Sequence, residues 1–381
     1  MRKGWEYKKL GEVCDITMGQ SPDGNSINEA NGVEFHQGKT CFGERFLGVS
    51  PLYSNAPTKL AEAHSVLLCV RAPVGYPNIT DRKICIGRGL CALYAKQEID
   101  NTFLFYSLLG KQAYFEKNAT GSTFKAISSK TVSNTTLSIP PKSTQLAIVS
   151  ELDKINELIR LKKEQLKDFD NLAQSLFYEM FGDPVENEKG WEVKKLNDIC
   201  DVRDGTHDSP KYLQNSEYIL ITSKNIVNGS IDFENVNYIS EEDYIKINKR
   251  SKVDNGDIIM PMIGTIGNPI IAHIDGTHKF CIKNVALIKF LADSTVNNMF
   301  IVNLMRCSSF SSYLLNQNKG GTQKFVALGA IRKLPIPLPP LSLQQLFAQR
   351  IEQIEREKSE VQKSIQDLET LLASRMQYWF E

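Results

Sequence analysis

One pattern of about forty residues occurs twice and constrains the fold more than any other feature of the chain. The first copy begins after Pro140-Pro141, and the second begins 199 residues later after Pro339-Pro340. Neither copy contains another Gly or Pro before residue 182 or the C-terminal end. Ser143, just after the first proline pair, is a residue type that caps helix N-termini. Apolar residues recur in both copies at alternating steps of four and three, which is the spacing of a coiled-coil seam. The pattern therefore predicts two long helices with apolar seams.

A coiled-coil seam needs a partner, and the other copy is the simplest one. The predicted seam consists of Ile148, Leu152, Ile155, Ile159, Leu166, Phe169, Leu176, Phe347, Ile351, Ile354, Val361, Ile365, Leu368 and Leu372. Lys162 and Lys358 each interrupt their seam once, and such polar positions help to fix register and partner choice. Each helix spans roughly 55 Å at about 1.5 Å per residue, and a lone helix in water is marginal. The alternative is that each helix packs only on its own domain.

The repeat extends beyond the helices. The opening segment Trp5 to Ile16 returns as Trp191 to Val202, 186 residues later, so the second copy carries about thirteen extra residues before its helix. We therefore predict an α+β fold with two globular α/β domains, joined by two long helices that form a coiled coil, with an internal repeat. The predicted boundaries are 1–141 for the first domain, 142–182 for the first helix, 183–340 for the linker and second domain, and 341–381 for the second helix.

The bodies of the two domains match each other poorly in sequence. Short apolar runs predict strands at 66–70, 91–94, 257–260 and 285–288, and longer patterns predict a helix at 102–114 and helical structure at 298–315. Similar frames with different bodies suggest one scaffold that presents two different recognition surfaces.

Composition narrows the class of protein. The 381 residues are 41% hydrophobic, with a formal net charge of +1, and no stretch has the length and apolarity of a signal peptide or a membrane span. The eight cysteines form no CxxC pair, so we expect neither a zinc site nor a disulfide framework, and we predict a cytoplasmic chain that contacts no membrane. The small net charge counts against a free-standing nucleic-acid binder, although it leaves room for a basic face.

Motifs for catalysis are missing from the sequence. There is no GxSxG, no HExxH and no paired carboxylate cluster for a metal ion. The two Pro-Pro pairs follow Ile139 and Leu338 and precede Lys142 and Leu341, so neither forms the polar-Pro-Pro-aromatic motif of an amino-methyltransferase. We therefore predict a chain without catalytic residues. His207 beside Asp208 is more typical of a loop hydrogen bond than of a general base.

Basic, amide and aromatic residues in Gly-rich loops remain as candidates for contact with nucleic acid. Arg and Lys recognise guanine edges, Asn and Gln recognise adenine edges, and all of them can bind phosphates. The candidates are Gln37, Lys39, Arg45, Arg71, Lys83, Arg88, Lys125, Arg203, His207, Lys211, Tyr212, Lys224, Asn225, Lys283 and Lys324. For each of them, the alternative is a solvated surface charge or, for Arg88 between two glycines, a brace for the fold.

The chain resembles the specificity subunits of type I restriction-modification enzymes over essentially its whole length. The repeated Trp-Glu-x-Lys-Lys-Leu openings at Trp5 and Trp191 and the repeated Pro-Pro-x(3)-Gln helix starts, with Gln145 and Gln344, carry most of the resemblance. Further family-like segments are Gln37 to Lys39, Arg71 to Gly75, Phe177 to Gly182 and Asp204 to His207. The Glu that members commonly carry before the helix-start Gln is absent from both copies.

The resemblance implies that each body recognises one half of a split, asymmetric sequence in double-stranded DNA. It also implies that the two helices form an antiparallel coiled coil with an internal pseudo-two-fold repeat. These helices then set the gap between the halves and dock two methyltransferase subunits, which motor-nuclease subunits can join. The chain itself is then non-catalytic and binds no cofactor, whereas S-adenosylmethionine, ATP and Mg²⁺ act in the partner subunits. We expect half-sites of about three to five base pairs, separated by about five to eight.

Two other functions compete with this hypothesis. A self-contained DNA methyltransferase or nuclease would need motifs that the sequence lacks. A coiled-coil assembly scaffold without a role in DNA binding would show no salt-dependent DNA affinity, even with partners present.

Overall fold

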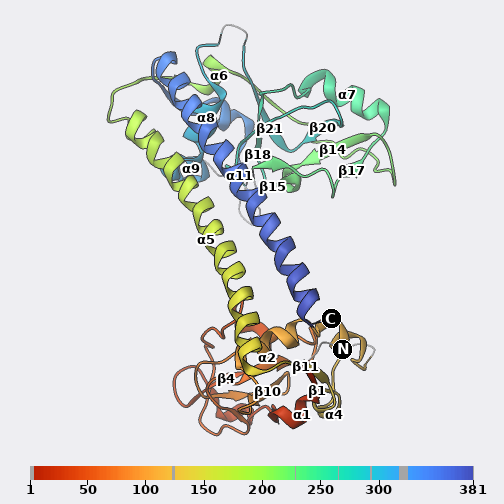
Figure 1. Ribbon diagram of the computed structural model, residues 1–381. Helices are drawn as coiled ribbons and strands as arrows, with labels where there is room; N and C mark the ends of the chain where they lie inside the picture. The colour runs from red at the N-terminus through yellow and green to blue at the C-terminus, as the bar shows by residue number, and fades with distance from the viewer. Residues whose placement is uncertain are drawn as a thin grey trace. The chain divides into compact units, whose positions relative to one another are not determined.

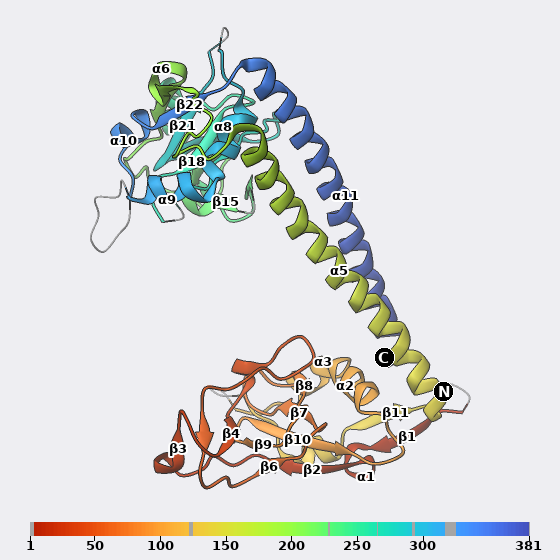
Figure 2. The ribbon, with the colours of Figure 1, turned by 90° about the vertical axis from the view of Figure 1, so that its left-hand side faces the viewer.

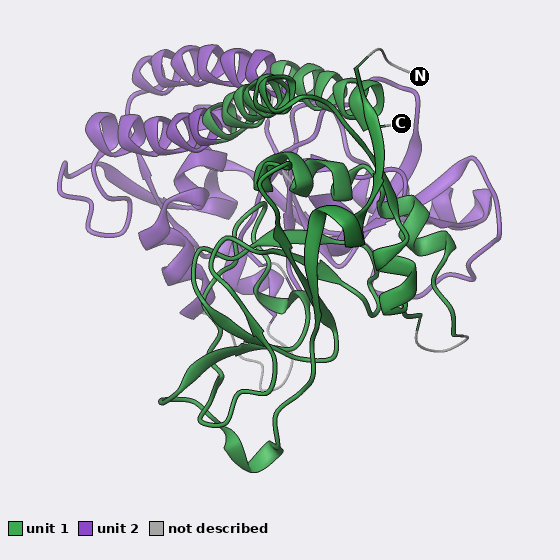
Figure 3. Cartoon of the chain, turned by 60° about the horizontal axis from the view of Figure 1, so that its bottom comes forward, with its two compact units in different colours: residues 1–163, 363–381 green, residues 164–362 purple. Residues whose placement is uncertain are grey.

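The computed structural model describes residues 4–121, 125–227, 229–264, 266–291, 294–316 and 325–380. The chain divides into two compact units, one of residues 1–163 with 363–381 and the other of residues 164–362 (Figure 3). Each unit therefore contains one body, the beginning of one long helix and the end of the other.

The strands of the first unit form three sheets (Figures 1 and 2). A two-stranded sheet pairs β1 (Glu6–Lys9) with β11 (Thr136–Ile139). A four-stranded antiparallel sheet has the order β2 (Cys14–Met18), β10 (Leu90–Ala95), β7 (Val66–Cys69), β8 (Pro77–Ile79). A five-stranded sheet has the order β3 (Ile27–Asn28), β5 (Tyr53–Ser54), β4 (Val33–His36), β9 (Ile84–Ile86), β6 (Leu60–Ala61), and its β4–β9 pair is parallel.

The second unit uses the same plan. Its two-stranded sheet pairs β12 (Glu192–Lys195) with β22 (Pro335–Leu338). Its four-stranded sheet has the order β13 (Asp201–Asp204), β21 (Val285–Lys289), β18 (Ile258–Pro261), β19 (Ile270–Ile271). A three-stranded sheet has the order β17 (Asn237–Tyr238), β14 (Tyr218–Thr222), β20 (Lys279–Lys283), and its β14–β20 pair is parallel. A small hairpin joins β15 (Ile226–Val227) to β16 (Ser230–Ile231).

The helices follow the same repeat. Those of the first unit are α1 (Leu10–Val13), α2 (Asn101–Leu109), α3 (Gln112–Lys117) and α4 (Ser129–Ser133), with 3₁₀ turns at Gly24–Ser26 and Lys39–Cys41. Those of the second unit are α6 (Leu196–Ile199), α7 (Glu241–Ser251), α8 (Asn298–Arg306), α9 (Ser308–Asn316) and α10 (Leu328–Arg332), with a 3₁₀ turn at Ser223–Asn225. The long helices are α5 (Lys142–Phe181) and α11 (Leu341–Phe380).

A buried glutamine anchors the start of each long helix. Gln145 accepts the backbone N–H of Asp100 at 2.8 Å and donates to the carbonyls of Glu98 and Pro140. Gln344 accepts the backbone N–H of Asn297 at 2.9 Å and donates to the corresponding carbonyls, Thr295 and Pro339. Both side chains are fully buried, and each amide satisfies backbone groups that would otherwise be unpaired in the interior. This explains the repeated Pro-Pro-x(3)-Gln pattern.

Both long helices contribute to both cores. In the first unit, Ile148 and Leu152 of α5 and Phe380 of α11 lie in one apolar cluster with the body. In the second unit, Phe177 of α5 and Phe347 of α11 lie in the corresponding cluster, with ring centroids 5.6 Å apart. The helix beginnings therefore do pack on their own domains, while each helix end completes the other domain.

Cross-helix pairs establish that the helices run antiparallel. In the first unit, Glu151 binds Arg375, and Lys163 binds Glu369 at 3.0 Å, so the α11 number falls as the α5 number rises. In the second unit, Lys358 donates to Asp170 at 2.8 Å, which gives this seam lysine a charged partner beside the helix pair. All fourteen predicted seam residues are buried or half-buried. The antiparallel coiled coil is confirmed.

Two of the predicted helices differ from those in the structure. The segments 102–114 and 298–315 are each two helices, with breaks at Gly110 and Cys307. A Cβ atom at Gly110 would lie 2.8 Å from the Cβ of Phe380, so the glycine makes room for the end of α11. The prediction of one helix at 102–114 was wrong, because this packing depends on a residue far away in the sequence, whereas 298–315 is helical as predicted apart from the break at Cys307.

No helix in the described part of the chain has both the length and the apolar character needed to cross a membrane. The eight cysteines are all free, and burial raises the pKa of six of their thiols.

Candidate nucleic-acid interface

A parallel strand pair places two loops at the same sheet edge in each unit. In the first unit, β4 and β9 run parallel, with His36 opposite Ile86, and they lead into the loops at 37–39 and 87–89. In the second unit, β14 and β20 run parallel, with Thr222 opposite Lys283, and they lead into 223–225 and Asn284. Because the carboxyl ends of parallel strands meet at one edge, segments far apart in the sequence converge there.

The edge in the first unit is a small basic hollow of about 150 Å³. Four of the predicted residues line it, namely Gln37, Lys39, Arg71 and Arg88. None of the residues that line it is acidic, so the three cations give it a positive field. The hollow therefore has the charge and the donor groups to hold a phosphate or the acceptor edge of a base.

Local packing explains how these cations come together. The Lys39 ammonium lies 4.3 Å from the centre of the Tyr76 ring, which holds it by a cation–π contact. A Cβ atom at Gly89 would lie 2.2 Å from the Gln37 carbonyl oxygen, so only glycine allows the two loops to approach this closely. The Arg88 side chain between the glycines is exposed. Lys125 joins the group through its carbonyl, which accepts the backbone N–H of Ala72 at 3.0 Å.

The edge in the second unit has another chemistry. Lys224 is exposed at its 3₁₀ turn, and Lys211 and Tyr212 are exposed in the segment between β13 and β14. Lys283 is nearly buried and donates to the Ser209 hydroxyl at 2.6 Å. This edge therefore combines exposed cations with a buried one that orders the 205–210 loop.

His207 lies at the same edge, with 60% of its side chain exposed. Its Nε2 lies 2.8 Å from the carboxylate of Asp204, and its Nδ1 lies 3.0 Å from Oδ1 of Asn284. The hydrogen bond to Asn284, followed by the one to Asp204, raises the pKa of His207 above its ordinary value. The sequence prediction of a loop hydrogen-bonding role matches this geometry.

The structure gives Arg45 a different environment. Its guanidinium binds both carboxylate oxygens of Asp153 on α5, at 2.6 and 3.2 Å, and donates to the Tyr106 hydroxyl. The same hydroxyl donates to Asp153 at 2.7 Å. Burial, followed by this hydrogen bond, raises the pKa of Tyr106. Arg45 therefore fastens the first body to α5, and we leave it out of the interface.

Three further candidates are also engaged within the protein. Asn225 is buried and bonds the backbone of Thr222 and Asn235, which closes its loop. Lys83 pairs with Glu62 at 2.7 Å. Arg203 pairs with Asp201 and with the carbonyl of Arg250. We leave these three out as well.

Some predicted features lie outside the described residues. One of them is Lys324, a candidate for contact with nucleic acid.

Arg250 was missed by the sequence reasoning. Its guanidinium binds the buried carboxylate of Asp204 and so shares that carboxylate with His207. The residue stands in the last turn of α7 beside Lys249, where cations commonly offset the helix dipole. The helix dipole alone accounts for a cation at this position, so the contact of Arg250 with Asp204 could not be predicted from the sequence. It becomes visible only in the fold, which brings β13 and α7 together.

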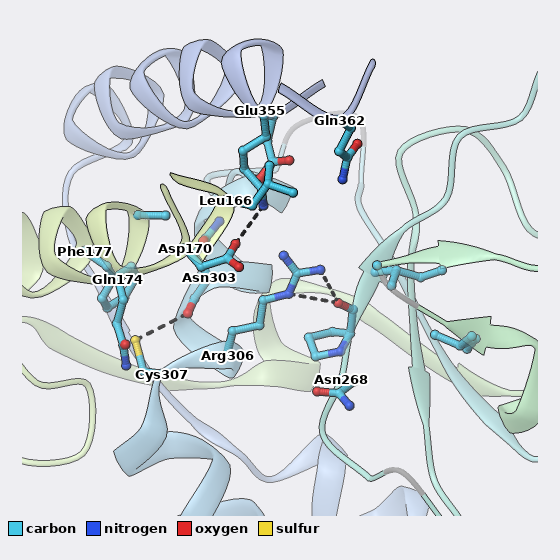
Figure 4. Close-up of a pocket in the computed structure, with 16 residues that line it drawn as sticks. Leu166, Asp170, Gln174, Phe177, Asn268, Asn303, Arg306, Cys307, Glu355 and Gln362 are labelled. Atoms are coloured by element: carbon cyan, nitrogen blue, oxygen red, sulfur yellow. Dashed lines mark hydrogen bonds and ion pairs between the residues drawn. The ribbon is translucent and has the colours of Figure 1, made fainter. Parts of the chain in front are cut away.

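The second unit also contains a larger hollow of about 620 Å³ between its portions of α5 and α11 and the body (Figure 4). Arg306 points into it and donates from Nε and Nη2 to the carbonyl of Pro269. The charged residues that line it are two cations, Arg306 and Lys358, and two carboxylates, Asp170 and Glu355. Because these charges balance, the hollow lacks the positive field of an anion site, and we do not add it to the interface.

Comparisons with known proteins agree with this architecture. A family model described as the type I restriction modification DNA specificity domain matches residues 2–168 and again residues 188–370. A putative type I restriction enzyme MjaX specificity subunit of Methanocaldococcus jannaschii is 38% identical over 176 residues, which are 45% of this chain and 41% of that protein. The MjaIX specificity subunit of the same organism is 25% identical and covers 91% of this chain and 85% of its own length.

A solved structure shares the fold. It comes from work on complex assembly and conformational transition of the type I R-M system, has a TM-score of 0.65 and is 18% identical. The match covers 100% of this chain and 98% of that one.

Proposed function

Because the chain belongs to the type I restriction-modification DNA specificity family, we propose that its two bodies each recognise one half of a split sequence in double-stranded DNA. The observation that carries the proposal is the pair of equivalent sheet edges. Both edges follow a parallel strand pair on the same scaffold, yet one presents Lys39, Arg71 and Arg88 while the other presents Lys211 and Lys224. Equivalent positions with different donors suit two half-sites with different letters.

The helices supply the spacing and the docking surface in this proposal. An antiparallel pair of long rigid helices suits a fixed number of unread base pairs between the half-sites. Exposed leucines on these helices, such as Leu146, Leu158 and Leu371, offer apolar surface that a partner can cover. We assign this surface to two methyltransferase subunits, which motor-nuclease subunits can join.

The chain performs recognition and no chemical step in this proposal. S-adenosylmethionine supplies the methyl group in the methyltransferase subunits, and ATP with Mg²⁺ acts in the motor-nuclease subunits. The competing scaffold hypothesis explains the helices but offers no reason for a basic hollow without an acidic residue.

A charge-reversal experiment tests DNA contact at the first edge. The complex of this chain with its modification subunits is titrated against a duplex that contains its site, at several salt concentrations. The double variant Lys39→Glu with Arg88→Glu should weaken binding at least about tenfold and flatten the salt dependence by about two phosphate contacts.

The matched control is Lys117→Glu with Lys130→Glu, which changes the net charge equally at exposed positions away from the hollow. This control should weaken binding less than about twofold. Equal effects of the two double variants would argue against the hollow as a DNA contact, and an absence of salt-dependent binding would favour the scaffold hypothesis.

A further inference from the structure

Asn284 has a fixed position at the tip between β20 and β21. Its φ of +58° is a left-handed conformation that asparagine tolerates better than most residues. Its backbone N–H donates to the carbonyl of Thr206 at 3.2 Å, and its own carbonyl accepts the Ser223 hydroxyl at 3.2 Å. The side chain therefore leaves a backbone that two neighbouring segments hold in place.

His207 faces two acceptors. The Asp204 carboxylate, which also binds Arg250, can only accept from Nε2, and the Asn284 Oδ1 can only accept from Nδ1. A ring that donates from both nitrogens is the protonated imidazolium. These two hydrogen bonds, the one to Asn284 first and the one to Asp204 second, are also what raises the pKa of His207.

The bond to His207 determines which group Asn284 presents to its surroundings. Its Oδ1 is turned toward His207, and its Nδ2 has no hydrogen-bond partner among the residues that the structure describes. Asn284 is only half-buried, so this amino group is available to a ligand. A free asparagine offers one donor group and one acceptor, whereas Asn284 offers donors alone.

The corresponding turn of the first unit, at 87–89, also presents hydrogen-bond donors without an acceptor, but through a different side chain. Gly19 donates to Leu90 and Gln20 to Ile86 there, and the matching bonds in the second unit run from Gly205 to Val285 and from Thr206 to Ile282. These bonds align the turn at 87–89 with Lys283 and Asn284. Arg88 is exposed in that first turn, and a guanidinium is also a donor without an acceptor.

We infer that Asn284 is a specificity-determining residue of the second body and that His207 is its positioning residue. The donor-only amide selects a base edge with acceptors, such as N7 and O6 of guanine or O4 of thymine. It does not form the bidentate pair with adenine that a free asparagine forms, because that pair needs Oδ1. The inference rests on the proposed function, since it concerns a residue at the proposed interface.

Recognition of the base edge by Asn284 depends on pH, because it depends on the protonation state of His207. The groups around His207 are Asp204 on β13, Arg250 on α7 and the neighbouring Asp208, with Lys283 beside Asn284. A neutral ring keeps its proton on Nε2 toward Asp204, so Nδ1 becomes an acceptor. Asn284 then turns its amino group inward and its oxygen outward, and adenine becomes acceptable.

Two variants separate the residues' roles. Asn284→Asp keeps the shape and the acceptor for His207 but replaces the outward donor with an acceptor. His207→Ala frees the Asn284 amide to rotate. His278→Ala is the matched control, because it removes an exposed histidine next to the opposite end of β20.

Each variant is co-expressed with its modification subunit in a host without DNA methylation, and methyladenine is mapped across the genome. We expect Asn284→Asp to change one letter of one half-site to cytosine or adenine, which offer donors. We expect His207→Ala to admit adenine at that same letter, and wild-type complex to do so progressively in vitro as the pH rises from about 6 to about 9. His278→Ala should leave every letter unchanged.

The inference is overturned if both variants methylate the wild-type motif with all letters intact. It is also overturned if they change several letters at once, since that indicates a distorted domain. A variant that fails to assemble is replaced by Asn284→Ser and His207→Gln in the same assay, with the same criteria. The motif methylated by the wild-type complex distinguishes failure of the proposed function from failure of this inference. If the wild-type complex methylates no split motif, the proposed function is refuted. If it methylates a split motif that the variants leave intact, only the inference about Asn284 and His207 is refuted.

Discussion

Arg45 and Arg88 show how the surroundings of a cation decide its role. Both are arginines in Gly-containing loops of the first body, and from the sequence Arg88 rather than Arg45 was the candidate for a brace of the fold. In the fold, Arg45 makes a bidentate contact with Asp153, while Arg88 stands exposed in a hollow lined by no acid. A guanidinium that already makes two hydrogen bonds to a carboxylate has fewer N–H donors left for a phosphate. The residues that give the two arginines different roles lie far away in the sequence, so sequence motifs could not distinguish these roles.

We predict that Arg45→Met destabilises the first unit without changing the DNA target. The ion pair is only partly exposed, and a bidentate pair of this kind contributes about 1 to 2 kcal/mol to the free energy of unfolding. Urea unfolding measures the loss. Lys83→Met is the control, because the Lys83–Glu62 pair is more than half exposed and should contribute close to nothing. Unchanged stability together with altered half-site letters would show that Arg45 contacts DNA.

At the scale of elements, the long helices were the most predictable part of the chain. Their apolar seam follows from a heptad pattern that is local and repeated. The bodies were less predictable. Their sequences match poorly, yet the order β2-β10-β7-β8 recurs as β13-β21-β18-β19. Short buried strands accept many apolar residues, so two such sheets can share a topology with little sequence in common.

The register of the helix pair can be tested by exchanging charges. Glu151 binds Arg375 and also accepts Trp379 Nε1 at 3.1 Å. Glu151→Arg and Arg375→Glu should each lower the free energy of unfolding, and the double variant should recover most of the loss. Chemical unfolding of the four proteins gives the coupling. Strictly additive losses would mean that the two side chains do not meet.

The spacing role of the helices predicts a change in the gap. Seven residues inserted in phase into both α5 and α11 lengthen each helix by about 10 Å, or about three base pairs. The methylated motif should then keep both half-sites and gain about three unread pairs. Removal of one heptad from each helix is the reciprocal control, and it should shorten the gap by the same number of base pairs. Altered letters with an unchanged gap would contradict the spacing role.

At the scale of the whole molecule, the repeat explains both what the sequence predicted and what it could not. The repeated openings and glutamines specify a frame, and the structure shows why: Gln145 and Gln344 satisfy equivalent backbone groups in the two units. The recognition surface is built from the parts that differ. Contacts such as His207 with Asn284 join residues 77 positions apart and depend on the exact ends of β13 and β20. Only the fold reveals them.

The central claim is that one chain recognises two different half-sites at a fixed distance. The most direct measurement is a methylome of a host that lacks DNA methylation and expresses this chain with its modification subunit. The account predicts one split motif, with two unlike half-sites and a single constant gap. A stable complex that methylates nothing, or that methylates a continuous or symmetric motif, would contradict it.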